Sequence, residues 1–193
     1  MNILSLNING LGKGDYKGSW IKNLITKHNL SIVGIQESKR RDISEMLAKN
    51  IWGGSDFDFV FQGSLGKSGG IMTLWNKDKF QKSNCILRQD CIVVKGIWSE
   101  TGKDMYIVNV YASQSREKRI DLWLFLAALL CRWTGHTIIF GDFNEVREEK
   151  ERRGSNFDRI GALEQDKFIR NNDLEDLKIG GKIIRGTTKK APR

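Results

Sequence analysis

The chain has 193 residues, enough for one domain with a sizeable buried core, and 39% of them are hydrophobic, which excludes a disordered protein. Its formal net charge of +9 favours a polyanionic partner, although a basic surface without a binding role is an equally open interpretation. Three cysteines without metal-binding spacing point to a reducing compartment, and no apolar run reaches transmembrane length, so we expect an intracellular protein with no membrane partner.

The first half of the chain predicts strands and helices in alternation. A helix is expected over 19–27, capped by Ser19 and with Trp20 on its buried side, and a shorter helix over 43–51 with Met46 inward. Alternating or continuous apolar residues predict four strands, at 2–7, 30–35, 57–61 and 71–75.

The second half continues the series of strands. A turn at 100–103 is expected to join two of them, and apolar helices are expected over 120–133 and 160–171. Strands are predicted at 85–87, 92–98, 105–111 and 137–144. Helices interspersed among so many strands predict a layered α/β sandwich, without internal repeats or a Pro-rich linker.

The most informative segment is the apolar run Thr137–Phe140, which ends in Gly-Asp-Phe-Asn. Side chains two residues apart on an extended chain leave the same side, so Asp142 and Asn144 are expected to project together from the end of a buried strand. Ligands bind at the carboxyl ends of strands in open α/β sheets. An acid and an amide at this place are suited to phosphodiester cleavage.

Polar groups follow other predicted strands as well, at Asn7, Glu37 and Tyr111. Hydrolysis of a phosphodiester needs a base, a divalent cation and donors for the developing charge. Because Mg²⁺ prefers oxygen ligands, Glu37 is the first candidate ligand, assisted by Asn7. Asp142 is expected to orient and deprotonate water, while Asn144 and Tyr111 contact phosphate oxygens.

Each of these residues also has a purely structural interpretation. Asn9 before Gly10 is typical of a turn, and Glu37 alone suits a solvated strand end. Tyr111 alone suits a core aromatic with an exposed hydroxyl, and Asp142 alone suits a helix cap. The functional hypothesis rests on the four strand ends occurring together in this order.

Five short stretches together resemble the endonuclease/exonuclease/phosphatase superfamily, and most closely the apurinic-endonuclease-like domain of plant LINE-type non-LTR retrotransposons. They are Leu6–Leu11, Ile35–Lys39, Gly69–Ile71, Val108–Tyr111 and Gly141–Asn144. The resemblance implies a four-layer α/β/β/α sandwich of two packed mixed sheets, DNase I-like, with Asn7 and Glu37 at the metal. It also implies Mg²⁺-dependent nicking of double-stranded DNA, in which Asp142, Asn144 and Tyr111 are catalytic.

The resemblance implies further expectations about the substrate and the context of the protein. Asn9, which stands where apurinic endonucleases have an acid, is expected to contact substrate together with the basic residues Lys39 and Arg40. We expect a monomer that acts in the nucleus and that belongs, in intact relatives, to a longer reverse-transcriptase polyprotein.

The sequence departs from the family pattern near its end, so we expect a partial endonuclease domain over 1–177 and a basic, aberrant segment over 178–193. The family continues with a Leu-Asp pair and a terminal Ser-Asp-His, whereas this chain has the basic, aperiodic run Gly180–Lys190. We therefore expect a fold that is incomplete at its C-terminus, with one sheet edge open, and weak or absent activity. The alternatives are a catalytically silent nucleic-acid-binding remnant, a phosphatase of the same superfamily, and a product that does not fold stably.

Overall fold

The structure, a computed structural model, describes residues 1–12, 16–66, 68–145 and 158–175. These residues form two compact units. The first combines Met1–Ser113 with Trp133–Asn144, and the second combines Gln114–Arg132 with the described residues from Glu145 onward. The predicted segment 178–193 lies outside the described residues.

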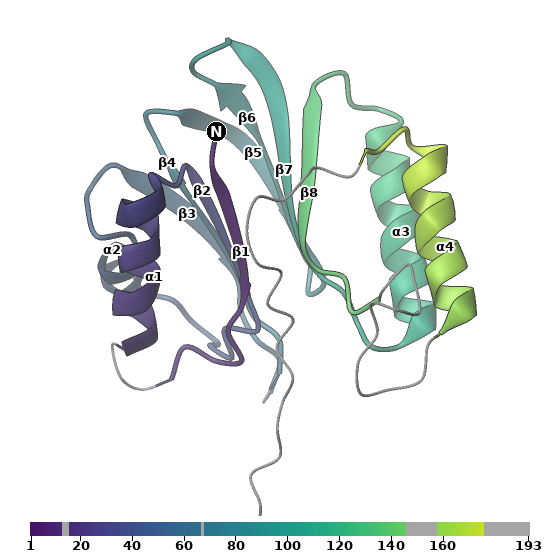
Figure 1. The fold of residues 1–193 in the computed structure, drawn as a ribbon, viewed down its shortest axis with the longest axis horizontal. Helices are drawn as coiled ribbons and strands as arrows, with labels where there is room; N and C mark the ends of the chain where they lie inside the picture. Colours follow the sequence, from purple (N-terminus) through teal and green to yellow (C-terminus); the bar gives the residue numbers. More distant parts are fainter. Residues whose placement is uncertain (13–15, 67, 146–157, 176–193) are drawn as a thin grey trace, which may run out of the picture. The chain divides into compact units, whose positions relative to one another are not determined.

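The first unit contains a four-stranded sheet whose outer face is covered by two helices (Figure 1). The first two strands are parallel and the other pairings are antiparallel, so the sheet is mixed. The strand order is β1-β2-β4-β3. The elements are β1 (Ile3–Asn7), α1 (Tyr16–His28), β2 (Ile32–Gln36), α2 (Glu45–Trp52), β3 (Phe57–Gln62) and β4 (Ile71–Asn76).

The second sheet of this unit is also mixed, in the order β5-β6-β7-β8, with only the last two strands parallel. The two sheets share a buried core to which Ile32 and Trp75 contribute from the first sheet and Ile92 and Ile107 from the second. The prediction of two packed mixed sheets is therefore confirmed. The strands are β5 (Phe80–Leu87), β6 (Cys91–Trp98), β7 (Lys103–Tyr111) and β8 (His136–Asp142).

The second unit is a pair of helices that pack against each other. Trp123 of one helix stacks on Phe168 of the other, with ring centroids 5.0 Å apart. The buried guanidinium of Arg119 pairs with Glu145 at 2.6 Å and with Asp158 at 3.2 Å, which joins the first helix to the start of the second. These helices are α3 (Arg116–Leu130) and α4 (Arg159–Asn171).

Three details of the predicted helices are wrong. Helix α1 begins at Tyr16, so Ser19 lies inside it and Trp20 is exposed. Met46 of α2 is exposed as well, because Ala48, Ile51 and Trp52 lie at helical spacing on the buried face and a residue two positions before Ala48 points away from it. Helix α3 begins four residues before position 120 and ends at Leu130, since its charged first turn, with Arg119 buried, belongs to the helix.

In the described ranges, no helix combines the length and hydrophobicity that a membrane span requires. The three cysteines are free thiols: Cys91 is buried in β6, Cys85 is half-buried in β5 and Cys131 is exposed.

Candidate active site

The predicted site residues other than Arg40 lie at one end of the two sheets of the first unit. In the parallel pair β1–β2, Asn7 is in register with Gln36, and in the parallel pair β7–β8, Tyr111 is in register with Asp142. The amide nitrogen of Asn7 donates a hydrogen bond to Oδ2 of Asp142 at 2.6 Å. The carboxyl ends of both parallel pairs therefore meet, although Asn7 and Asp142 are 135 residues apart in the sequence.

Asp142 is held by hydrogen bonds at both of its carboxylate oxygens. Oδ2 accepts from Asn7, and Oδ1 accepts from the backbone N–H of Asn144 at 3.0 Å. The side-chain nitrogen of Asn144 donates to the carbonyl of Ala112 at 2.7 Å, and its backbone is left-handed, with φ 49°. Asp142 is thus the last residue of β8 and Asn144 lies in the turn after it, so the prediction of an extended strand over 137–144 with both side chains on one side is wrong.

The turn that carries Glu37 is clamped between two other loops. Glu37 has a φ of 58°, and its carbonyl accepts from the N–H of Gly10 at 2.6 Å. The N–H groups of Ser38 and Lys39 donate to Gly70 and Gly69, each at 2.9 Å. These backbone bonds fix the point at which the Glu37 side chain leaves the sheet.

Lys39 and Asn9 lie beside this carboxylate. The ammonium of Lys39 is 3.4 Å from Oε1 of Glu37 and also donates to Oδ1 of Asn9. The backbone N–H of Asn9 donates to Oδ1 of Asn7 at 3.2 Å. One chain of contacts therefore runs from Lys39 through Asn9 and Asn7 to Asp142.

Tyr111 experiences the charges of both carboxylates. Burial raises the pKa of the Tyr111 phenol above its ordinary value, and the negative charges of Glu37 and Asp142 raise it further. The hydroxyl therefore stays protonated over a wide pH range and remains a hydrogen-bond donor. Glu37 follows β2 of the first sheet and Tyr111 ends β7 of the second, so the phenol lies on the same junction that the hydrogen bond from Asn7 to Asp142 crosses.

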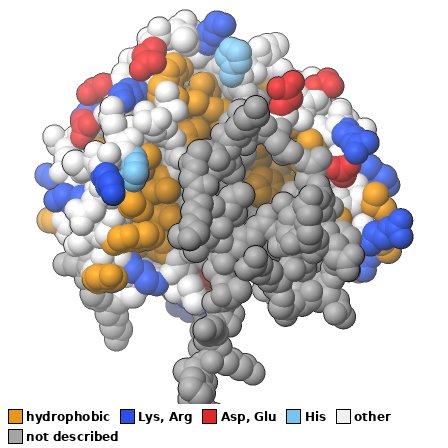
Figure 2. Space-filling model, in the orientation of Figure 1, with side chains coloured by type: hydrophobic (Ala, Val, Ile, Leu, Met, Phe, Trp, Pro, Cys, Tyr) orange, Lys and Arg blue, Asp and Glu red, His pale blue; other side chains and the backbone are white. Residues whose placement is uncertain are grey.

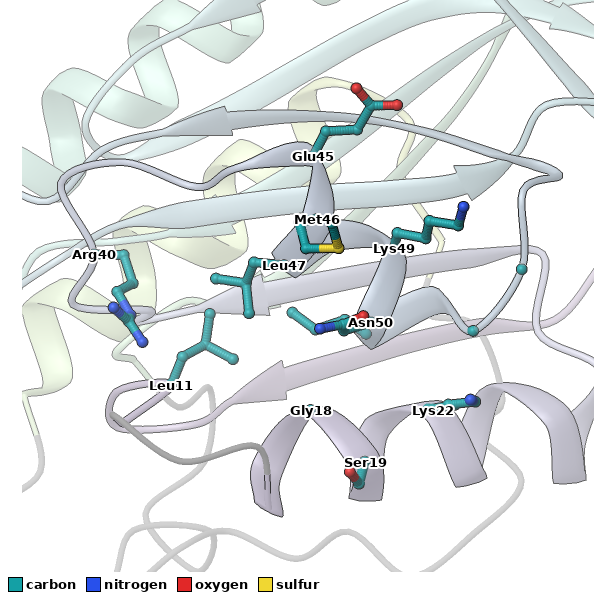
Figure 3. A pocket seen from close by; sticks show the side chains of 13 residues that line it. Leu11, Gly18, Ser19, Lys22, Arg40, Glu45, Met46, Leu47, Lys49 and Asn50 are labelled. Atoms are coloured by element: carbon teal, nitrogen blue, oxygen red, sulfur yellow. The ribbon is translucent and has the colours of Figure 1, made fainter.

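Arg40 is turned away from this cluster, since its guanidinium donates to the carbonyl of Gly12. It lies at one end of a groove between α1 and α2, which is lined by Lys22 and Lys49 as well as by apolar side chains such as Met46 (Figure 3). The groove and the strand-end cluster are separate features of the first unit.

Several residues that support the site were not identified as such from the sequence. Lys17 of α1 donates to the carbonyls of Ile8 at 2.5 Å and Gly10 at 2.6 Å, which fixes the turn after β1. Gln36 and Asn109, which precede Glu37 and Tyr111 at their strand ends, are fully buried rather than solvated. Their only signal in the sequence is a polar side chain inside an otherwise apolar strand.

Neither histidine of the chain is near the cluster. His28 ends α1, where its carbonyl accepts from Asn2 at the start of the chain, and His136 is the first residue of β8, at the far end from Asp142. Both side chains are exposed. Among the described residues, the groups of the cluster that can exchange a proton are the two carboxylates, the Tyr111 phenol and the Lys39 ammonium.

The cluster offers hard oxygen donors, namely the carboxylates of Glu37 and Asp142 and the amide oxygen of Asn7. In the part of the chain that is described, no three His, Cys, Asp or Glu side chains gather in a metal-binding group. Mg²⁺ commonly takes only one or two carboxylates from the protein and completes its shell with water and substrate phosphate. Two carboxylates and one amide oxygen at the same strand ends therefore fit a hard divalent cation.

Solved structures with a similar fold include DNA-processing enzymes. An AP endonuclease from Leishmania major has a TM-score of 0.69 at 14% identity, over 88% of this chain and 65% of its own. An AP endonuclease from Archaeoglobus fulgidus has a TM-score of 0.64 at 13% identity, and the alignment covers 88% of this chain and 69% of the endonuclease. A 3′ phosphatase from Neisseria, bound to a product DNA hairpin, has a TM-score of 0.62 at 14% identity, over 87% and 69%. The chain thus spans about two thirds of the length of these structures, and the likeness establishes its DNase I-like α/β fold.

No curated protein matches the sequence significantly. The model of the endonuclease/exonuclease/phosphatase family, in contrast, matches residues 4–177, which include every residue of the cluster and, except for the first residue of β1, both sheets. The chain belongs to the endonuclease/exonuclease/phosphatase family.

Proposed function

We propose that the chain is a Mg²⁺-dependent DNA phosphodiesterase that nicks one strand of a duplex, and that it derives from a LINE-type retrotransposon. The observation that carries the proposed chemistry is the hydrogen bond between Asn7 and Asp142, which joins the ends of the two sheets next to Glu37 and Tyr111. DNA as substrate is supported by the net charge of +9 and by the DNA hairpin bound to the Neisseria phosphatase.

The chemistry follows from the positions of the side chains. Asp142 accepts hydrogen bonds from Asn7 and Asn144, which aim its carboxylate, and it orients and deprotonates the attacking water. The neutral phenol of Tyr111 donates to a phosphate oxygen as negative charge develops there. Glu37 and Asn7 would hold Mg²⁺, which supplies charge stabilisation on the phosphoryl group when bound. The ammonium of Lys39 supplies a further positive charge for the substrate phosphate.

We expect turnover by this 193-residue chain to be slow. A phosphodiester hydrolase gains rate from a group that protonates or stabilises the departing oxygen. Neither histidine can do this at the cluster, because His28 ends α1 and His136 begins β8, at the opposite end of that strand from Asp142. Within the described part of the chain, Tyr111 and Lys39 supply donors at the cluster. The proposed retrotransposon role and the nuclear site of action rest on the sequence resemblance.

The proposal is tested with a supercoiled-plasmid nicking assay on the purified chain. Nicking is expected to require Mg²⁺ and to fall by at least about a hundredfold in Glu37→Gln, because the substitution removes the negative charge that attracts the cation. Glu117→Gln, an exposed acid on the first turn of α3, is the matched control and should nick like the parent.

Nicking that persists in EDTA, or that is equal in the parent and Glu37→Gln, would contradict the proposal. The similarity to the Neisseria 3′ phosphatase favours a second candidate activity, release of phosphate from a DNA 3′ end. A duplex with a 3′-phosphate distinguishes the two: phosphate release without plasmid nicking would favour the phosphatase activity, and its loss in Glu37→Gln would assign that activity to the cluster.

A further inference from the structure

A pair of buried amide side chains crosses the junction between the two sheets. Gln36, the last residue of β2, donates from Nε2 to Oδ1 of Asn109 in β7 at 2.6 Å. Both side chains are 0% exposed, and the core between the two sheets is otherwise filled by apolar residues such as Ile71 and Ile107. A buried amide without a partner is costly, so this hydrogen bond has to form when the sheets pack.

The pair is fixed on both sides by further hydrogen bonds. Nδ2 of Asn109 donates to the carbonyl of Met72 at 3.0 Å and to Oγ1 of Thr73 at 3.1 Å, both in β4. Nε2 of Gln36 also donates to Oγ of Ser5 in β1 at 3.2 Å. A single residue of the second sheet is thus bonded to two strands of the first, and through Gln36 it is connected to a third.

The local sequence makes room for this contact. Gly34 lies two residues before Gln36 on the same side of β2, and a Cβ at this position would be 2.9 Å from the amide of Asn109 and 2.3 Å from the ring of Phe140. A larger residue would therefore push β7 and β8 away from β2. The absence of a side chain lets Asn109 approach the backbone of the first sheet.

Both amides stand next to residues of the cluster. Gln36 directly precedes Glu37, and Asn109 is two residues before Tyr111 on the same side of β7. Tyr111 is in turn in register with Asp142. The buried pair therefore connects the strand that carries Glu37 to the strands that carry Tyr111 and Asp142.

We infer that Gln36 and Asn109 are positioning residues, whose hydrogen bond sets the separation between Glu37 on one sheet and Tyr111 and Asp142 on the other. Apolar contacts between sheets are non-directional and tolerate sliding, whereas an amide pair has one favourable alignment. A displacement of about 1 Å at a catalytic group can cost about a hundredfold in rate. The effect on rate rests on the proposed function, while the geometric part of the inference does not.

The kinetic test compares Asn109→Leu and Gln36→Met, which keep similar volume, with Ile107→Ala. The first two are expected to lower kcat for Mg²⁺-dependent nicking at least about tenfold while KM changes less than about twofold. Ile107→Ala opens a cavity in the same core and leaves both amides in place, so it should lower the melting temperature yet keep kcat within about twofold when assayed well below that temperature.

The double variant Gln36→Asn/Asn109→Gln exchanges the two amides, and its kcat should recover most of the rate that the single amide variants lose. A parent-like kcat in both amide variants would overturn the inference, as would an equal loss in Ile107→Ala.

A second measurement does not depend on activity. With 3-fluorotyrosine incorporated, the ¹⁹F resonance of Tyr111 is assigned by its loss in Tyr111→Phe, and Glu37→Gln is expected to displace it, because the Glu37 charge acts on this phenol. In the Asn109→Leu background the same displacement should fall to half or less. An undiminished displacement there would overturn the inference. If Asn109→Leu abolishes the effect of Glu37→Gln on the ¹⁹F resonance but the parent never nicks DNA, the positioning role stands and the proposed nuclease function fails.

Discussion

Gly141 shows how one backbone conformation fixes the candidate site. It precedes Asp142, has a φ of 140° and lies in register with Val110 of β7. A Cβ at this position would be 2.0 Å from the Val110 carbonyl oxygen and 2.7 Å from the Val110 nitrogen, atoms that cannot move without breaking the pairing of β7 and β8. Gly141 therefore brings β8 close to β7 immediately before the residue that acts as the proposed base.

We predict that Gly141→Ala lowers the free energy of unfolding by about 2–4 kcal/mol, since it combines an unfavourable φ with a backbone collision. Gly18→Ala is the matched control. A Cβ at Gly18 in α1 meets only a side-chain carbon of Ile51 at 3.6 Å, so this change should stabilise by about 0.5–1 kcal/mol through helix propensity. Urea unfolding of both variants measures the difference. Equal effects of the two substitutions would contradict the steric argument.

The phenol of Tyr111 provides a pH-dependent test at the same scale. Its folded pKa is raised by burial, Glu37 and Asp142, so the folded state keeps this proton to higher pH than the unfolded state, and its contribution to stability is lost as the pH rises through the folded pKa. Absorbance at the phenolate band, with Tyr111→Phe as the reference, should show ionisation above the ordinary tyrosine value. Glu37→Gln should move that ionisation to lower pH, whereas an upward movement would contradict the assignment of the charges.

At the scale of the elements, three turns beside strand ends share a left-handed residue. Asn9, Glu37 and Asn144 have φ values of 48°, 58° and 49°. Asn adopts this conformation more readily than most residues, so the interpretation of Asn9 as a turn residue is correct and is compatible with its contact to Lys39. Glu37 lacks this preference, and its conformation is maintained by the backbone bonds from Gly10 and to Gly69 and Gly70 around it.

Helix α2, which follows the Glu37 turn, begins with a side-chain cap. Oγ of Ser44 accepts from the N–H of Leu47 at 3.2 Å. We predict that Ser44→Ala costs about 1 kcal/mol of stability because an N–H of the first turn loses its partner. Ser19→Ala, at an exposed position inside α1, is the control and should be within about 0.5 kcal/mol of the parent in the same unfolding experiment. A larger loss in Ser19→Ala would mean that α1 has its cap there after all.

On the scale of the whole molecule, the charge is basic but mixed. The chain has 32 Lys and Arg against 23 Asp and Glu. Among the described residues visible in Figure 2, blue and red side chains are interspersed. The overall charge therefore predicts attraction to DNA without identifying the face that binds it, and Lys39 beside Glu37 supplies the most specific candidate contact.

We predict salt-dependent binding of duplex DNA, measured by fluorescence anisotropy between about 50 and 200 mM KCl, because each phosphate contact releases a counterion. The double variant Lys39→Ala/Arg40→Ala should reduce the slope of log Kd against log salt by about one to two. Lys27→Ala/Lys77→Ala removes the same charge at the other end of the first sheet and should keep the slope. Tight binding without nicking would support the alternative of a silent nucleic-acid-binding protein. The absence of binding at low salt would contradict both this alternative and the proposed nuclease function.

The sequence by itself determined the α/β class, most strand positions and the polar residues that follow the strands, because alternation and turn residues are local properties of the chain. The start of β5 at Phe80 was missed, since residues 81–84 are polar and exposed, and β8 ends at Asp142 rather than at position 144. It also carried the stretches on which the family assignment rests. The starts of α1 and α3 were predicted three and four residues too late. The exposed Trp20 and Met46 also show that residue type alone does not tell which side of a helix is buried.

Only the tertiary structure decided which of these residues meet. Asn7 and Asp142 are joined by a hydrogen bond over 135 residues, and Glu37 acts on Tyr111 from the opposite sheet. Gln36 and Asn109 proved to be buried, and Arg40 turned away toward Gly12. These outcomes depend on how two sheets pack and on which side chains can satisfy their hydrogen bonds there, a condition that no local stretch of sequence contains.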